Sequence, residues 1–241
     1  MFKSNRNPQF RSKFSEDIFN TKYSHEGAET LHELSCTLVN DVCQSKLTAD
    51  EKEELIDHIS NLRFIPGGRY LYYAGRDKKF FNNCYLLKAE EDTREDWAKL
   101  SWEAESCLMT GGGIGADYSI YRQEGQILKG TGGISSGPIP KMQMINEIGR
   151  HVMQGGSRRS AIYASLNWKH ADIDQFLVSK NWHDMPVGNT GQTIFDVKQD
   201  DFNFPAPLDM TNISVNYDTE WLLNYWETGE VGDVFKTNVY Q

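Results

Sequence analysis

A glycine-rich stretch at residues 111–161 limits most strongly what this chain can fold into. It holds twelve of the chain's 20 glycines, with clusters that read GGGIG, GTGG and QGGSRR. Glycine weakens the interior of helices and strands, and it is favoured where the backbone turns tightly or comes close to a ligand. The stretch therefore predicts strands and helices joined by three glycine loops, rather than one regular element.

Basic residues accompany these glycines. Arg122 and Lys129 stand beside the first two clusters, and Arg158 and Arg159 lie in the third. Glycine amides together with Arg and Lys are typical of phosphate-binding sites. A plainer alternative is that the glycines are helix caps and turns and that the arginines are solvated surface charges. The pattern alone leaves both interpretations open.

Charge and composition narrow the expected partners. The net charge of -9 and the pI of 5.2 disfavour nonspecific binding to nucleic acid or to an anionic membrane. No run approaches the roughly 18 apolar residues of a membrane helix, and the basic N-terminus lacks the apolar core of a signal peptide, so we expect a cytoplasmic protein. The four cysteines include no CxxC pair and the six histidines include no HExxH motif, so neither a disulfide framework nor a bound metal is predicted.

Hydrophobic periodicity predicts an α/β fold, preceded by an irregular segment before about residue 20. Helical spacing and capping signals predict helices at 31–42, 48–62, 93–108, 140–152, 172–177 and 218–226. Short apolar or alternating runs predict strands at 69–74, 84–87, 116–121, 160–166 and 213–215. The last residues carry no signal for a closing helix. The alternation of strands and helices indicates a sheet with parallel pairs.

Two familiar nucleotide-binding motifs are disfavoured. The run GGGIGA is not a P-loop, because no Gly-Lys-Ser/Thr follows it. It is a poor dinucleotide fingerprint, because Tyr118 occupies the third glycine position and the glycines follow a predicted helix.

Cys84, on a short apolar strand, is most simply a packing residue when it is taken alone. Asp92 either stabilises the N-terminus of a helix or bonds a ribose hydroxyl.

Four linked motifs carry a more specific signal. They are Phe81-Asn-Asn-Cys84, Gly111-Gly-Gly-Ile-Gly115, Gly130-Thr-Gly-Gly-Ile-Ser-Ser-Gly-Pro138 and Gly155-Gly-Ser-Arg-Arg-Ser-Ala161. In this order and at these distances they resemble the large subunit of ribonucleotide reductase, in the form of its adenosylcobalamin-dependent class. The resemblance implies a ten-stranded α/β barrel of two half-barrels, threaded by a finger loop. It also implies reduction of the ribose 2′-hydroxyl, in which a thiyl radical abstracts the 3′-hydrogen and a cysteine pair supplies two electrons.

The same resemblance implies roles for single residues. Cys84 matches the first cysteine of the redox pair, which replaces the packing interpretation. The residues matched to the effector site are Asp92, Arg122, Lys129, Gln154 and Arg158, and those assigned to the substrate site are Asn83, Ser135 and Ser136. The implied ligands are adenosylcobalamin, bound mainly outside this chain, a dNTP or ATP effector, a ribonucleotide substrate and a thioredoxin-like reductant.

The sequence departs from that family in one large respect. The finger-loop motif Asn-x-Cys-x-Glu, with the radical cysteine and a catalytic glutamate, is absent, and so is the second redox cysteine. We therefore expect the N-terminal half of a reductase, either from a split gene or as a truncated fragment, with a helical region at 1–62 and the first half of the barrel at 63–241. Its expected partner is the C-terminal half in a separate chain, and a homodimer is a further option. The alternative is a regulatory nucleotide-binding module with no catalytic role.

Overall fold

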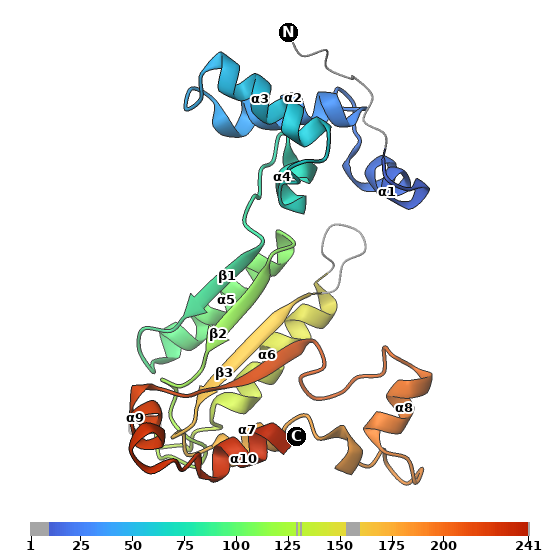
Figure 1. Ribbon diagram of the computed structural model, residues 1–241. Helices are drawn as coiled ribbons and strands as arrows, with labels where there is room; N and C mark the ends of the chain where they lie inside the picture. The colour runs from blue at the N-terminus through green and yellow to red at the C-terminus, as the bar shows by residue number, and fades with distance from the viewer. Residues whose placement is uncertain (1–9, 129, 131, 153–159, 241) are drawn as a thin grey trace. The chain divides into compact units, whose positions relative to one another are not determined.

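The computed structural model describes residues 10–128, 130, 132–152 and 160–240. The chain divides into two compact units, Met1–Asn82 and Asn83–Gln241 (Figure 1). Residues 63–82, which the sequence analysis grouped with the barrel, contribute Leu71 and Ala74 to the core of the first unit. Within the described ranges, no helix is long and apolar enough to cross a membrane.

The first unit is helical. It comprises α1 (Lys13–Ile18), a π-helical turn (Phe19–Tyr23), α2 (Leu31–Cys43), α3 (Ala49–Ser60) and α4 (Gly68–Tyr73). The predicted capping box of Thr48 and Glu51 starts α3, and a second capping box starts α2. Leu34 of α2 and Ile59 of α3 belong to one buried core. The helices predicted at 31–42 and 48–62 are therefore confirmed.

Two predictions for this unit were wrong. Residues 13–23 are helical where irregular chain was expected, and the Ser12 side chain caps α1 by accepting from the Ser15 amide at 3.2 Å. Residues 69–74, predicted as a strand, form α4. Aromatic residues favour a strand only where a neighbouring strand offers a pleated surface, and the described part of this unit contains helices instead. Leu71 therefore packs into the helical core, and Arg69 donates through Nη1 to the Phe80 carbonyl at 2.9 Å.

The second unit is built on a sheet of four parallel strands in the order β1-β2-β3-β4. Its elements are β1 (Cys84–Lys88), α5 (Arg94–Met109), β2 (Gly113–Asp117), α6 (Pro138–His151), β3 (Ile162–Asn167), α7 (Ile173–Val178), a 3-10 turn (Trp182–Asp184), α8 (Ile194–Asp200), β4 (Thr211–Asn216), α9 (Thr219–Thr228) and α10 (Gly232–Tyr240). In register, Cys84 lies opposite Gly113, and Ile114 lies opposite Ile162. The predicted α/β class with parallel pairs is confirmed.

The connecting helices lie on one side of this sheet. Right-handed crossovers between parallel strands in sequential order place every connecting helix on the same side, and α5 and α6 lie behind the strands in Figure 1. The core on that side joins alternate strand residues to the two helices: Leu87, Ile114, Ala116, Ile162, Ala164, Leu166, Leu100, Ala104, Leu108, Met142 and Ile145. The opposite side of the sheet is not covered by α5 or α6.

Two further predictions for this unit need correction. The strand expected at 116–121 is β2, but it runs from Gly113 to Asp117, and residues 118–121 lie in the loop after it. The first glycine cluster ends α5, where Gly111 has a φ of 81° that favours glycine, and its remainder from Gly113 is strand rather than loop. The last residues form α10, although no closing helix was predicted; its first residue is Gly232, which has a φ of 75°.

Asp218 starts α9 as its sequence position predicted. One carboxylate oxygen accepts from the Trp221 amide and from the Trp168 indole, both at 3.1 Å, and the other accepts from the Asn167 side chain at 3.2 Å. These bonds, led by the Trp221 amide, lower the pKa of Asp218 to about 2. The carboxylate thus ties the end of β3 to the start of α9.

The Asp218 carboxylate should make the free energy of unfolding depend on pH in the acid range. Its folded pKa lies below the ordinary value of 3.8, so its contribution is present above that value and is lost as the pH falls toward 2. We expect the midpoint of urea unfolding to fall more steeply between about pH 4 and pH 2 in the wild type than in Asp218→Asn. Tryptophan fluorescence at several pH values measures this, with the exposed Asp174→Asn as the control. Parallel pH profiles for wild type and Asp218→Asn would contradict the assignment.

Candidate active site

The side of the sheet that α5 and α6 leave uncovered carries mostly small and polar side chains. Because successive side chains of a strand point to opposite sides, the residues that alternate with the buried ones project here. They are Cys84, Leu86, Lys88, Gly113, Gly115, Asp117, Tyr163, Ser165, Asn167, Asn212, Ser214 and Asn216. We call this surface the open face.

Cys84 places a thiol on the open face. It is the first residue of β1, and its side chain is exposed and free. Its register neighbour is Gly113, where a Cβ would lie 3.8 Å from the Cys84 Sγ and 3.2 Å from the Ala161 carbonyl oxygen. Glycine at 113 therefore keeps space beside the sulfur. The interpretation of Cys84 as a core-packing residue is wrong, because its side chain is not in the core.

The other cysteines occupy different surroundings. Cys107 lies on α5 and packs against the core on the helix-covered side of the sheet, so it is separated from Cys84 by the sheet itself. Burial, and then the charge of Glu103, raise the pKa of the Cys107 thiol. Cys36 and Cys43 belong to the first unit. Among its described residues, the open face thus has one thiol, with no partner thiol beside it.

Asp92 and Arg122, both assigned to the effector site, are brought together by the loops that follow β1 and β2. The Arg122 Nε and its amide donate to one Asp92 oxygen, the amide at 3.1 Å, and the Arg122 Nη2 donates to the Asp92 carbonyl at 2.7 Å. The Trp97 indole donates to the other carboxylate oxygen at 2.8 Å. A carboxylate has about four acceptor sites, so this second oxygen keeps one for a ligand hydroxyl.

Beneath this pair lies Tyr121, which sequence reasoning missed. Its ring stands 4.4 Å from that of Trp97, and its side chain is 1% exposed. The Tyr121 hydroxyl has no hydrogen-bond partner among the described residues. Burial, followed by the charges of Asp96 and Asp92, raises its pKa to about 12, so it stays a neutral phenol. The spacing of Asp92 and Trp97 across the start of α5 sets the indole against the carboxylate, but no local sequence pattern marks Tyr121.

The residues assigned to the substrate site are not gathered at one place. Asn83 is exposed at the amino-terminal edge of the sheet, where its carbonyl accepts from the Gly113 amide at 2.8 Å. Ser135 and Ser136 lie between β2 and α6, at the carboxyl-terminal edge. The Ser135 side chain is buried and accepts from the Gly137 amide at 3.1 Å, whereas Ser136 is exposed. A five-residue strand spans roughly 16 Å, so the two groups lie at opposite ends of the sheet.

The remaining effector-site predictions, Lys129, Gln154 and Arg158, lie outside the described residues. Within the described chain, the carboxyl-terminal edge of the open face adds a polar network that the sequence analysis did not select. Asn216 donates to the Ser165 hydroxyl at 3.0 Å, and that hydroxyl donates to Asp117 at 3.4 Å. The polar residues that alternate with apolar ones in β3 and β4 were the available signal.

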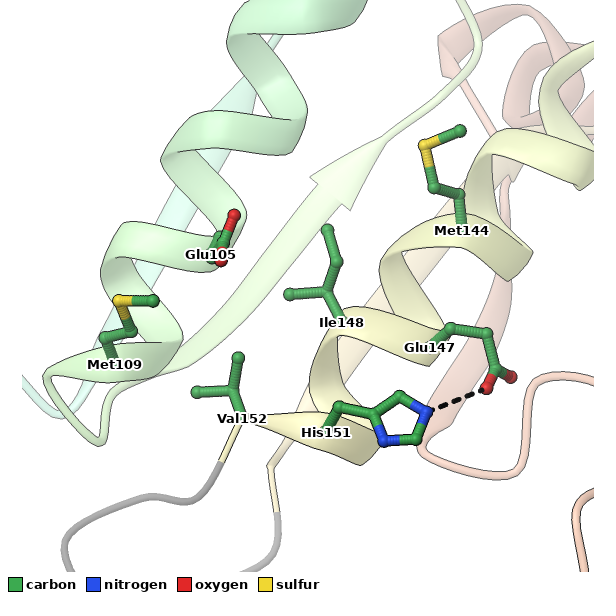
Figure 2. A pocket seen from close by; sticks show the side chains of 7 residues that line it. All are labelled: Glu105, Met109, Met144, Glu147, Ile148, His151 and Val152. Carbon is green, nitrogen blue, oxygen red and sulfur yellow. Dashed lines mark ion pairs between the residues drawn. The ribbon is translucent and has the colours of Figure 1, made fainter.

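A separate groove lies between α5 and α6, on the helix-covered side of the sheet (Figure 2). It is lined by Glu105, Met109, Met144, Glu147, Ile148, His151 and Val152. It does not reach the open face, because the sheet intervenes. No cluster of three or more His, Cys, Asp or Glu side chains that could hold a metal occurs in the described part of the chain.

The geometry thus defines a parallel α/β sheet with one exposed thiol on its open face and an Asp–Arg pair at one edge. Comparison with known proteins shows what part of this chain resembles. Residues 82–195 match the family described as ribonucleotide reductase, barrel domain. This segment, which contains β1, β2 and β3, is therefore similar to the barrel domain of ribonucleotide reductases.

Individual relatives agree with the family. The chain is 33% identical over 122 residues to the vitamin B12-dependent ribonucleoside-diphosphate reductase of Mycobacterium tuberculosis (strain CDC 1551 / Oshkosh), covering 51% of this chain and 18% of that protein. It is 32% identical over 119 residues to the ribonucleoside-diphosphate reductase subunit alpha of Chlamydia muridarum, covering 49% and 11%. It is 31% identical over 128 residues to the large subunit of Arabidopsis thaliana, covering 52% and 16%. The chain thus spans less than a fifth of the length of these relatives.

Proposed function

We propose that this chain forms part of the catalytic subunit of a ribonucleotide reductase, an oxidoreductase that makes deoxyribonucleotides for DNA synthesis. The observation that carries the proposal is the exposed Cys84 thiol beside Gly113, on a sheet of the reductase barrel family. A nucleophilic or redox-active thiol must be accessible, and the open face supplies that access. The substrate is a ribonucleotide held over the open face.

In this proposal Cys84 is one of the two thiols that reduce the substrate. The ribose 2′-hydroxyl leaves as water, C2′ gains a hydrogen, and the two thiols give up two hydrogens and become a disulfide. A thioredoxin-like dithiol then restores the thiols. The second thiol and the radical cysteine come from a C-terminal half of the reductase, because these 241 residues contain no Asn-x-Cys-x-Glu sequence.

The cofactor of the proposed enzyme is adenosylcobalamin. This part of the proposal rests on the relatives that are named vitamin B12-dependent. Neither the groove between α5 and α6 nor the groove beside β1 is lined by Cys84, so neither would hold a corrin next to this thiol. We therefore assign the cofactor to residues outside the described part of the chain and route no step through it.

Allosteric control of the proposed enzyme uses the Asp92–Arg122 pair as a nucleotide site. The Arg122 side chain is 31% exposed and held in place by Asp92, so its guanidinium is already oriented for a phosphate. The free acceptor site of Asp92 suits a ribose hydroxyl. Lys129, Gln154 and Arg158 complete the proposed effector site from outside the described residues.

Removing the Arg122 side chain should weaken binding of a deoxynucleoside triphosphate. A charge-assisted hydrogen bond contributes about 1.5–3 kcal/mol, so Arg122→Ala should raise the Kd roughly tenfold or more, and Asp92→Asn should also weaken binding. Isothermal titration calorimetry with dATP, dGTP and dTTP measures this. Arg94→Ala is the matched control, because Arg94 is two residues from Asp92 and its side chain is 91% exposed. Equal losses in Arg94→Ala and Arg122→Ala would show a general charge effect, not a site.

The function as a whole is tested by reconstitution. The purified chain alone, with adenosylcobalamin and a dithiol, should turn over no ribonucleotide. Adding a polypeptide that carries the Asn-x-Cys-x-Glu sequence should give deoxyribonucleotide, measured by chromatography. If the two polypeptides associate and bind dNTP but the product never depends on this chain, the alternative of a regulatory nucleotide-binding module is favoured.

A further inference from the structure

Helix α9 exposes an apolar surface that the fold of this chain does not use. Leu222, Leu223 and Trp226 are 55%, 56% and 87% exposed, and no residue of α9 is buried. Exposed apolar side chains that stand alone are ordinary, but a contiguous group on one element marks an interaction site. These three residues lie at positions i, i+1 and i+4 of the helix and therefore form one stripe. We call them the α9 stripe.

The opposite side of α9 is the one that holds the helix in place. The Trp221 indole donates to the Val231 carbonyl at 3.1 Å. Its ring stacks on Phe235 of α10, with centroids 5.4 Å apart, and meets the Tyr217 ring in a tilted contact at 4.8 Å. In a helix, residue 221 points about 140° away from residue 226. The Trp221 side of α9 is therefore its packing side. The α9 stripe lies on the exposed side of a helix that other contacts already anchor.

Acidic residues border the α9 stripe. Glu227 follows Trp226 directly, and Glu230 lies two residues beyond the last residue of α9; neither has an ion pair among the described residues. Two other acidic residues nearby are already paired, Glu220 with Lys169 and Asp233 with Lys236. The chain as a whole carries a net charge of -9. A partner for this surface must therefore bring apolar side chains flanked by Lys or Arg, and a second copy of the same acidic stripe would repel it.

We propose that the α9 stripe is a docking site for an amphipathic helix of another polypeptide, apolar on one side and basic at its border. A helix suits the site because the stripe is itself a ridge of side chains at i and i+4 spacing, into whose neighbouring grooves a second helix packs. The proposal concerns a surface outside the open face and does not depend on the reductase chemistry.

A designed peptide tests this directly. The probe is a fluorescent 18-residue helix of Leu and Lys with one apolar side, and fluorescence anisotropy measures its binding to the full chain. A scrambled peptide of the same composition and a matched Leu/Glu helix are the peptide controls. Wild-type protein should bind the Leu/Lys helix at least about tenfold more tightly than either control.

Variants then place the binding on α9. Trp226→Ser and Leu223→Ser should each weaken binding of the Leu/Lys helix about tenfold or more, and Glu227→Lys should weaken it further at low salt. Trp102→Ser is the matched control, because Trp102 is 68% exposed on α5, and it should change nothing. These substitutions are on exposed side chains, and circular dichroism confirms the fold.

Three results would overturn the proposal. The scrambled peptide could bind as tightly as the helix, which would show charge attraction alone. Trp102→Ser could weaken binding as much as Trp226→Ser, which would show that any exposed tryptophan suffices. Sedimentation velocity could show that the wild-type chain self-associates through α9 and that Trp226→Ser makes it monomeric, in which case the occupant is a second copy. None of these results would bear on Cys84, so failure here leaves the proposed function separately testable.

Discussion

Replacing Cys84 by serine is expected to abolish dithiol-driven turnover in the reconstituted enzyme while leaving the fold intact. Serine keeps the size of the side chain but cannot form a disulfide, so the two electrons have no source. Because the side chain is exposed, the free energy of unfolding should change by less than about 0.5 kcal/mol. Product formation should fall to the background of the C-terminal half alone, measured as deoxyribonucleotide formed over time.

The matched control is Cys107→Ser, because the Cys107 thiol lies on the other side of the sheet and has a raised pKa. This variant should keep its turnover, and Cys84→Ser should keep its dNTP affinity. Mass spectrometry of the oxidised complex identifies the partner thiol, whose Cα must lie about 4.4–6.8 Å from that of Cys84. Normal turnover by the reconstituted Cys84→Ser enzyme would show that Cys84 has no redox role. A disulfide between Cys84 and Cys107 would contradict the arrangement of the sheet.

Local signals in the sequence were sufficient for much of the fold. The Thr48 capping box, the Asp218 cap and the short apolar run at Cys84 predicted the starts of α3, α9 and β1, because each depends on neighbours in sequence. The strand prediction for residues 69–74 was wrong for the opposite reason. Their side chains suit a strand, but the partners available in the first unit are helices, and tertiary context overrides propensity.

The candidate site was likewise predictable from the sequence only in part. The motifs selected Cys84, Asp92 and Arg122, but no local pattern says that Asp92 and Arg122 bond each other across 30 residues, or that Tyr121 lies buried beneath them. The first glycine cluster misled for a related reason. The glycines predict a loop, whereas Gly113 lies in a strand, where a Cβ would make a tight contact of 3.2 Å with the Ala161 carbonyl oxygen. Such distances belong to the packed sheet and not to the sequence.

A buried charged cluster holds α6 to the segment that precedes β4. The Asp209 side chain is 6% exposed, and it accepts from Arg150 at 2.6 Å, from Lys198 at 3.3 Å and from Asn146 at 3.1 Å. Burial by itself would raise the pKa of Asp209, but the hydrogen bonds from Arg150 and Asn146 outweigh it, so the pKa lies below its ordinary value of 3.8. The carboxylate therefore remains charged in the fold and is the shared partner of two cations.

Asp209→Ala is expected to be the most destabilising single substitution proposed for this chain. It leaves Arg150 and Lys198, 17% and 10% exposed, without their common counter-ion, and breaking a buried pair costs about 3–5 kcal/mol. For a domain of this size that corresponds to a fall in Tm of roughly 6–20 °C. Urea unfolding followed by fluorescence measures the loss, with Asp174→Ala as an exposed control that should stay within about 0.5 kcal/mol of wild type.

A double variant separates the buried charge from the packing. Arg150 keeps a second partner in Glu147 at 2.9 Å, so Lys198 is the cation that Asp209→Ala leaves without an ion pair. If that buried charge causes the loss, the double variant Asp209→Leu with Lys198→Met should recover a large part of it, because apolar side chains of similar volume remove the charge. The wild type should also lose the stability contributed by Asp209 as the pH falls through and below 3.8, since the folded pKa is the lower one, and Asp209→Ala should lack that loss. An Asp209→Ala protein within about 1 kcal/mol of wild type at neutral pH would show that the cluster does not hold α6 to β4.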